Sequence, residues 1–337
     1  MKGFNKRKVS VFIFWVIIGG IIGYLIVNSI KPVVNISKPV EIRVDSDKFQ
    51  FINPILYLRT DKSLYSDEFK NLVNELDLSI NSDLSDHTAD DISVYFRYLN
   101  TGHWTGINEN ELYRPSSMLK VLTLMSTVKL IEYGAISPTQ MIQYNPAEDD
   151  KQYYKPNDNM VSGHYPVQDL MKVMIVDSDN GANSALLSNE SINAEFNDTY
   201  KLFRLPNPSA ASTTPDFMSV RSYSVIFRTL YNATYLSDNS SEQVLSLLTH
   251  TNFTSGLTAG IPKNIVVAHK FGEATDDDVS GSIISRELHD CGIIYYPGKP
   301  YLLCVMTKGT DFSKLEGVIS GISEIAYDFV SRGGLGK

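Results

Sequence analysis

Ser117-Met-Leu-Lys120 opens an almost continuously apolar segment that runs to Tyr133. In a helix, side chains three residues apart share one face, so the serine hydroxyl and the lysine amine would lie together. A partly desolvated lysine loses its proton more readily and can serve as base for a serine. A helix that is apolar on most sides is usually buried at the centre of a domain. This stretch therefore predicts a central buried helix, ended by Gly134, whose first turn carries a candidate nucleophile.

The Ser-x-x-Lys pattern is common by chance, and Ser126-Thr-Val-Lys129 repeats it in the same segment. Two further motifs favour the first copy, Ser117–Lys120, as the functional one. Ser178-Asp-Asn180 follows a predicted helix and is by itself an ordinary turn tripeptide. Lys270-Phe-Gly272 ends a predicted strand, where a glycine lets a ligand approach the backbone closely. A serine, two lysines and a hydroxyl relay suffice for acyl transfer without a histidine.

The segments around these motifs predict one antiparallel sheet built from both ends of the chain, with a helical insert between its parts. Hydrophobic periodicity distinguishes the predicted strands from the predicted helices. The strands cover residues 92–99, 103–108, 265–269, 291–296 and 301–307; the helices cover about 66–78, 117–133, 167–176, 217–231, 241–248 and 315–329.

The three motifs, in this order, resemble the signature of the penicillin-binding protein and class A β-lactamase superfamily: Ser-x-x-Lys, Ser-Asp-Asn and Lys-Thr-Gly. Ser212-Thr-Thr-Pro215 and the closing hairpin around Cys291–Pro300 look like further parts of that family. The similarity spans about Leu64 to Val330. It implies an α/β sandwich fold of the class A β-lactamase type, in which helices flank an antiparallel sheet beside a mostly helical subdomain.

The resemblance also implies a catalytic role for four residues. Ser117 would be the acylated nucleophile, and Lys120 would take its proton. Ser178 would relay a proton to the leaving nitrogen. Lys270 would favour the anionic end of the substrate and hold the charge state of Lys120 and Ser178.

Four more residues would contact the substrate. Asn180 would bind the acylamino side chain, and the backbone N–H groups of Ser117 and Glu273 would form an oxyanion hole. Phe271 and Gly272 would contact the substrate from the strand that also carries Glu273.

The chain departs from the family in two places. Phe271 stands where the family has a threonine or serine, so a hydroxyl for the β-lactam carboxylate is lost. One lost hydrogen bond to a charged group costs about 1.5–3 kcal/mol. The family's Glu-x-x-Leu-Asn motif, which activates the deacylating water, is also missing. Of the acids that remain in that segment, Glu190, Glu195 and Asp198, the last lies nearest the expected position, although a solvated surface acid is the simpler interpretation.

The N-terminus predicts a membrane anchor. Four of the first eight residues are basic, and residues 9–30 carry no charge, which is long enough to cross a bilayer core of about 30 Å. We therefore expect a basic cytoplasmic tail at 1–8, a transmembrane anchor at 9–30, an extracytoplasmic linker at 31–60 and the hydrolase domain at 61–337. A cleavable signal peptide is the competing interpretation, but the segment ends in a poor cleavage site.

Composition limits the partners. The net charge of the 337 residues is 30 − 38 = −8, which argues against a nucleic-acid partner. Two cysteines and six histidines without paired-ligand spacing imply no metal, and no organic cofactor is implied. Asp276-Asp-Asp278 could hold a cation, but we favour a solvated loop.

If Pro297-Gly298 is a two-residue turn, Cys291 and Cys304 face each other; we favour two small buried apolar residues over a disulfide.

The sequence leaves several functions open. The first is a membrane-anchored serine hydrolase that attacks a β-lactam amide through an acyl-Ser117 intermediate, slowly because the deacylating glutamate is missing. A carboxypeptidase acting on a D-Ala-D-Ala-like cell-wall peptide uses the same chemistry. A third function is that of a sensor which stays acylated, and a fourth is that of a catalytically dead relative used for scaffolding. The sequence makes no prediction of the oligomeric state.

Overall fold

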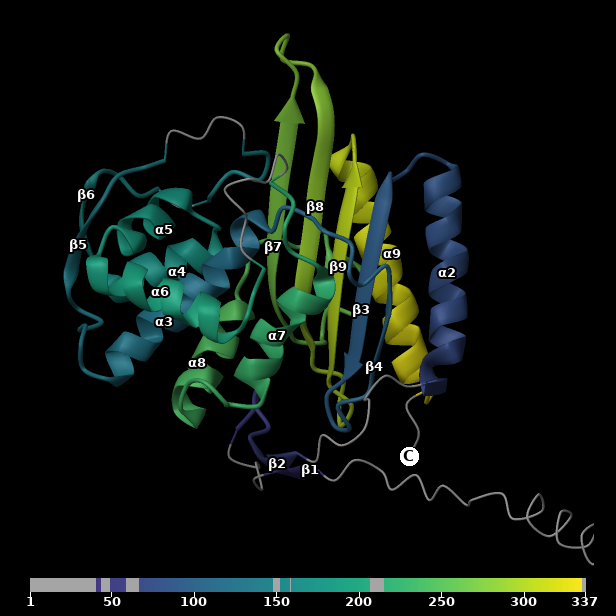
Figure 1. Ribbon diagram of the computed structural model, residues 1–337, viewed down its shortest axis with the longest axis horizontal. Helices are drawn as coiled ribbons and strands as arrows, with labels where there is room; N and C mark the ends of the chain where they lie inside the picture. The colour runs from purple at the N-terminus through teal and green to yellow at the C-terminus, as the bar shows by residue number, and fades with distance from the viewer. Residues whose placement is uncertain are drawn as a thin grey trace, which may run out of the picture. The chain divides into compact units, whose positions relative to one another are not determined.

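The computed structural model describes residues 41–43, 49–58, 67–147, 152–157, 159–206 and 215–334. Its central element is a five-stranded antiparallel sheet with the order β4-β3-β9-β8-β7 (Figure 1). The sheet confirms the expectation that both ends of the chain contribute strands. Its strands are β3 (Asp91–Tyr98), β4 (Trp104–Ile107), β7 (Val267–Asp277), β8 (Ile283–Ile294) and β9 (Tyr301–Gly309).

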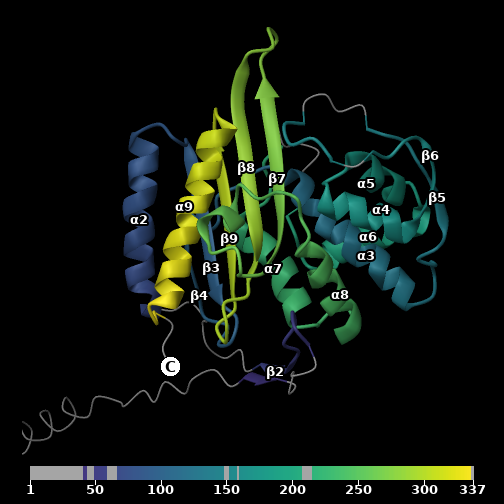
Figure 2. The ribbon, with the colours of Figure 1, turned by 180° about the vertical axis from the view of Figure 1, so that it is seen from behind.

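Helices cover both faces of this sheet. α2 (Lys70–Ser85) and α9 (Phe312–Ser331) lie side by side on one face, and α7 (Val220–Tyr231) lies on the other (Figures 1 and 2). Because side chains alternate along a strand, each strand feeds two separate cores. On β9, Leu303 and Val305 join the core under α2 and α9, whereas Leu302 and Met306 join the other core.

The insert between β4 and β7 is mostly helical, as the sequence predicts. α3 lies at its centre and is buried along most of its length, including Lys120, which is only 3% exposed. α3 spans Lys120–Glu132. The elements around α3 are η2 (Ser116–Leu119), β5 (Met141–Tyr144), β6 (Gly163–Pro166), α4 (Val167–Val176), α5 (Asn180–Leu187), α6 (Glu190–Leu202) and α8 (Asp238–Leu248).

Two helices, the β5–β6 pair of the insert and one hairpin differ from the sequence prediction. α5 has only eight residues and α6 is largely polar, so periodicity does not reveal them; the side chains of Asp179 and Asn189 cap their N-termini. β7 and β8 are longer than expected because their polar ends pair with each other beyond the other strands (Figure 1). The residues of this two-stranded extension are half-exposed and polar, so they lack the alternation of apolar and polar residues that predicts a strand.

The folded domain begins before residue 61, where we placed its boundary. β1 (Glu41–Arg43) pairs with β2 (Ile55–Leu58), and Phe51 and Ile52 are buried. The carboxylate of Glu242 on α8 accepts hydrogen bonds from the backbone N–H groups of residues 50–52 at 2.8–3.1 Å. Part of the expected linker is thus packed against the helical insert.

Within the described ranges, no helix combines the length and the apolar character needed to cross a bilayer. The predicted anchor at 9–30 lies outside these ranges, and so do residues 212–214 of the Ser-Thr-Thr-Pro motif.

The closing hairpin has the predicted register. Cys291 on β8 is directly opposite Cys304 on β9, and the two residues form a disulfide. Our preference for two unpaired cysteines is therefore wrong. Spacing alone places the two side chains on one face but does not decide whether the sulfurs bond.

A buried ionic cluster ties the sheet to the turn before Ser117. Glu287 on β8 is 1% exposed, and its carboxylate accepts a hydrogen bond from the Arg114 N–H at 2.8 Å. His289 and Lys308 lie 3.2 Å and 3.5 Å from the same carboxylate. Burial alone would raise the pKa of Glu287, but these partners outweigh it and lower the pKa to about 2.

This cluster predicts a pH-dependent loss of stability in Glu287→Gln. Breaking a buried ion pair costs about 3 kcal/mol, so the variant should unfold at lower urea concentration at neutral pH. The folded-state pKa of about 2 lies below the ordinary 4.5, so the stabilisation is present above 4.5 and is lost as the pH falls toward 2. Urea unfolding at pH 7 and pH 3, with Glu75→Gln in an exposed pair as control, measures both effects. An equal difference at both pH values would contradict the assignment.

Candidate active site

Ser117 and Lys120 lie where the sequence predicts, on one face of the first turn. Ser117 is in η2, Lys120 is the first residue of α3, and Lys120 Nζ donates to Ser117 Oγ at 2.9 Å. Lys120 Nζ also donates to Ser178 O and Asn180 Oδ1, each at 2.6 Å. Ser117 Oγ is thus one of the three nearest acceptors around this amine, with Ser178 Oγ at a longer 3.3 Å.

The second Ser-x-x-Lys copy is structural. Ser126 is buried and donates to Thr199 Oγ1 at 3.2 Å, and Lys129 donates to the Tyr235 carbonyl at 2.7 Å. Both contacts hold α3 against its neighbours. Identical spacing thus has different consequences at the two ends of one helix.

Ser178 joins the two lysines of the site. It lies between α4 and α5 with φ at 58°, a left-handed conformation that is unusual for a residue with a side chain. Lys270 Nζ donates to Ser178 Oγ at 2.9 Å, and Lys120 Nζ lies 3.3 Å from the same oxygen. One hydroxyl thus contacts a lysine from the helical insert and a lysine from the sheet.

Lys270 is the most deeply buried charged group of the site, with 0% exposure. Burial, followed by the neighbouring charge of Lys120, lowers its pKa well below 10.5. Its Nζ also lies 4.2 Å from the ring centroid of Phe271. Two adjacent ammonium groups disfavour each other, so this arrangement favours a state in which one lysine of the pair is neutral.

Asn180 and Asp179 have separate functions within the Ser-Asp-Asn motif. Asn180 accepts from Lys120 and donates from Nδ2 to Gln152 Oε1 at 3.2 Å. Asp179 faces away from the cleft: it caps α5 through Ala182 N and accepts from Tyr144 Oη at 3.2 Å. The aspartate therefore fixes the backbone that presents Ser178 and Asn180.

Gly272 lets the edge strand approach the nucleophile. β7 is an outer strand of the sheet, and it packs on η2. A Cβ at residue 272 would lie 2.5 Å from Pro115 O and 2.8 Å from Met118 Cγ. Ser116, next to the nucleophile, has φ at 47°. Only a glycine fits this contact, which sets the distance between β7 and Ser117.

A cleft of about 250 Å³ opens over Ser117. Its wall includes residues that the motifs did not reveal, and its lining residues are Arg114, Ser116, Ser117, Gln152, Asn180, Glu273, Ala274 and Thr275. The Glu273 carboxylate accepts from the backbone N–H groups of Tyr153 and Tyr154 at 3.1 Å and 2.9 Å. Adjacent tyrosines in a polar stretch were the available signal for this segment, because large aromatic side chains seldom lie in a loop without packing.

The three acids considered for deacylation have other contacts. Asp198 is on the exposed side of α6 and pairs with Lys201, and Glu195 accepts from Tyr235 Oη at 2.8 Å. Glu190 begins α6 and is exposed. A second hollow of about 210 Å³ beside Ser117 holds no acidic side chain among its described lining residues, which are Ser116, Ser117, Leu119, Lys120, Thr123, Asn180, Asn183, Leu187 and Phe196.

Asp276 is likewise engaged. Its two carboxylate oxygens accept from Arg114 Nη2 at 2.8 Å, and Asp278 accepts from Ser280 and Ser282 within its own turn. The described residues hold no group of three His, Cys, Asp or Glu side chains placed to bind a metal ion.

A family model described as the beta-lactamase enzyme family matches residues 75–330. The chain belongs to this family. The matched range contains all eight predicted site residues and all five strands of the central sheet. No curated protein sequence matches the chain.

Solved structures of beta-lactamases share the fold. A beta-lactamase from Xanthomonas campestris pv. campestris has a TM-score of 0.63 at 19% identity, covering 77% of this chain and 98% of the other. One from Chitinophaga pinensis has a TM-score of 0.64 at 18% identity, covering 76% and 100%. A mutant of PBP-A, solved as an acyl-enzyme complex with penicillin G, has a TM-score of 0.62 at 18% identity, covering 77% and 97%. Identities this low show the fold alone.

The close contact at Gly272 predicts that Gly272→Ala lowers the rate of Ser117 acylation. The added methyl pushes β7 away from Pro115, and a displacement of about 1 Å at a catalytic group can cost 100-fold in rate. Quenched acylation assays with intact mass detection measure the effect. The control is Gly317→Ala in α9, where nothing lies within 4 Å of the added atom. Equal acylation by both variants would contradict this role of Gly272.

Proposed function

We propose that the protein is an extracytoplasmic serine hydrolase that attacks a β-lactam amide through an acyl-Ser117 intermediate. The observation that carries the proposal is the 2.9 Å contact between Lys120 Nζ and Ser117 Oγ, with the other two positions of that amine held by Ser178 O and Asn180. A neutral Lys120 in this position directs its lone pair at the serine hydroxyl. Membership of the beta-lactamase enzyme family supports the same chemistry.

Acylation then follows from the contacts of the site. Ser117 Oγ forms a bond to the substrate carbonyl carbon while its proton passes to Lys120 Nζ. The carbon–nitrogen bond of the amide breaks, and the leaving nitrogen receives a proton from Ser178 Oγ, which contacts both lysines. Lys120 returns its proton to Ser178, so the ester of Ser117 and a protonated leaving group are the products.

The oxyanion would bind at the sheet edge. We assign its donors to the backbone N–H groups of Ser117 and Glu273, as the family resemblance implies. The approach of β7 to η2 at Gly272 supports this assignment, because it brings the two backbones together. Loss of one oxyanion donor typically costs about 100-fold or more in rate.

Deacylation would be slow. The described lining of the hollow beside Ser117 has amide, hydroxyl and apolar side chains and the Lys120 amine but no carboxylate, and Asp198 and Glu195 have contacts elsewhere. This favours a second candidate function, in which the protein is a penicillin-binding protein-like carboxypeptidase or a sensor that stays acylated by a β-lactam or a cell-wall peptide. A PBP-A mutant of the same fold is described as an acyl-enzyme complex with penicillin G.

The extracytoplasmic location is supported by the N-terminal sequence. The basic residues within 1–8 and the uncharged run at 9–30 would hold the domain at the outer side of a membrane as a single-pass protein. Cell-wall peptides and β-lactams would both reach Ser117 there.

Covalent labelling of the full chain in detergent tests the proposal. Incubation with a fluorescent penicillin should add one label to the wild type and none to Ser117→Ala, which lacks the nucleophile. We expect the adduct to persist for hours by intact mass, because the described lining of the hollow holds no carboxylate to activate a water molecule. An adduct that clears while product accumulates would instead show a turnover β-lactamase. Absence of any Ser117-dependent adduct with penicillin would overturn the β-lactam assignment.

A further inference from the structure

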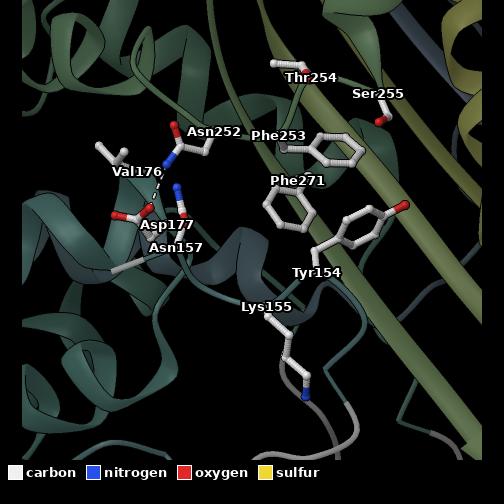
Figure 3. Close-up of a pocket in the computed structure, with 10 residues that line it drawn as sticks. All are labelled: Tyr154, Lys155, Asn157, Val176, Asp177, Asn252, Phe253, Thr254, Ser255 and Phe271. Carbon is white, nitrogen blue, oxygen red and sulfur yellow. Dashed lines mark hydrogen bonds between the residues drawn. The ribbon is translucent and has the colours of Figure 1, made fainter. Parts of the chain in front are cut away.

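A further pocket of about 470 Å³ is lined by chain neighbours of Ser178 and Lys270 (Figure 3). Val176 and Asp177, which line it, directly precede Ser178, and Phe271 directly follows Lys270. Tyr154 lines the pocket two residues after Gln152, which lines the cleft over Ser117. Under the proposed function Ser178 protonates the leaving group, so this pocket would receive the part of the substrate that leaves.

One wall of this leaving-group pocket is aromatic. The rings of Phe253 and Phe271 stack at 4.3 Å, and Tyr154 meets both rings nearly at right angles (Figure 3). Phe253 and Phe271 are only 6% and 4% exposed, so the stack is a fixed part of the fold. The faces of Phe253 and Phe271 cover each other, so this wall offers a ligand apolar contact and no charged group that would bind an anion.

The lysine of the catalytic group does not reach this pocket. Lys270 Nζ is fully buried, donates to Ser178 Oγ and to Phe271 O, and lies over the Phe271 ring. An anion in the pocket would therefore be separated from this ammonium by a phenyl ring.

Carboxylates stand on either side of the aromatic wall. Asp177 lines the pocket and accepts from Asn252 Nδ2 at 2.6 Å. Glu273 lines the adjoining cleft, and its carboxylate accepts from the backbone of Tyr153 and Tyr154. Lys155 is the one cationic residue among the described residues of the pocket lining, and it is exposed to solvent. Arg114, which lines the cleft with Glu273, is paired with Asp276. Like charges near a site disfavour an anionic ligand.

We infer that the leaving-group pocket takes an uncharged or cationic group and disfavours a carboxylate, with Phe271 and Glu273 setting this preference. The substrate class is then an acyl compound, such as a peptide, whose leaving part ends in an amide or an amine. The inference rests on the proposed acyl-Ser117 chemistry and reverses the expectation that Lys270 favours an anionic substrate end. β-Lactams, which carry a carboxylate, would acylate Ser117 but would be poor ligands of this pocket.

Three thioesters of the same N-acylated glycine test the inference with the full-length protein. Their leaving groups are mercaptoacetate, mercaptoacetamide and thiocholine, which carry a negative, a neutral and a positive charge. Ser117 Oγ bonds to the acyl carbon, the carbon–sulfur bond breaks, and the released thiol is followed with a chromogenic disulfide. We expect kcat/KM for the amide and the ammonium compounds to exceed that for the carboxylate by about tenfold or more.

Two variants identify the residues responsible. Phe271→Thr uncovers Lys270 and adds a hydroxyl, and Glu273→Gln removes the carboxylate while keeping the backbone N–H. Each should raise the carboxylate-to-amide ratio of kcat/KM by at least about threefold. Glu75→Gln on α2 changes a residue that does not line the pocket; it removes one carboxylate and should leave the ratio unchanged.

The outcomes separate this inference from the proposed function. Thiol release that requires Ser117 but is fastest with the carboxylate compound would overturn the inference and leave the serine hydrolase assignment standing. An unchanged ratio in both variants would also overturn it. No Ser117-dependent release from any of the three thioesters, together with no penicillin adduct, would instead overturn the proposed function.

Discussion

Two lysine amines held around one serine hydroxyl are the constraint on which the site depends. Ser178 Oγ contacts Lys270 at 2.9 Å and Lys120 at 3.3 Å, and both lysines are buried. Removing ammonium groups from water is unfavourable, and placing two of them together adds repulsion. The energy of this arrangement must come from the packing of the surrounding domain. Burial and repulsion also favour a neutral amine, which can accept a proton from a serine hydroxyl. The arrangement that lowers the stability of the fold is therefore the same one that the proposed chemistry needs.

The rest of the structure keeps these amines in place. Lys120 and Ser178 come from the helical insert and Lys270 comes from the sheet, so the site exists only where the two parts meet. Behind Lys270, the buried Asp290 supplies a compensating negative charge and is itself held by His269 and the backbone N–H of Leu257. Before Ser117, Glu287 anchors the Arg114 backbone in the same way. Buried polar groups of this kind stabilise only when every partner is present.

The edge of β7 is one of the two places where this chain differs from the pattern of its family. A phenyl ring covers the lysine where the family has a hydroxyl, and the Glu273 carboxylate is bonded to the segment that crosses beside the cleft. The proposed acylation depends on Ser117, Lys120 and Ser178, which lie outside β7 and which these changes leave intact. Lys270 is the one group of the proposed reactive centre that shares β7 with Phe271 and Glu273.

Sequence patterns alone determined the order of elements, the five-stranded sheet and the three motifs, because burial imposes a period on strands and helices and because chemistry restricts residue types. They also determined that Cys291 and Cys304 are opposite each other. They did not reveal α5 and α6, whose stability comes from caps and neighbours, or the packing of Phe51 and Ile52. Only the tertiary structure decided which Ser-x-x-Lys copy meets Ser178, that Asp198 faces solvent, and that Phe271 covers Lys270. Those facts depend on how separate elements pack against one another, and local periodicity carries no information about such contacts.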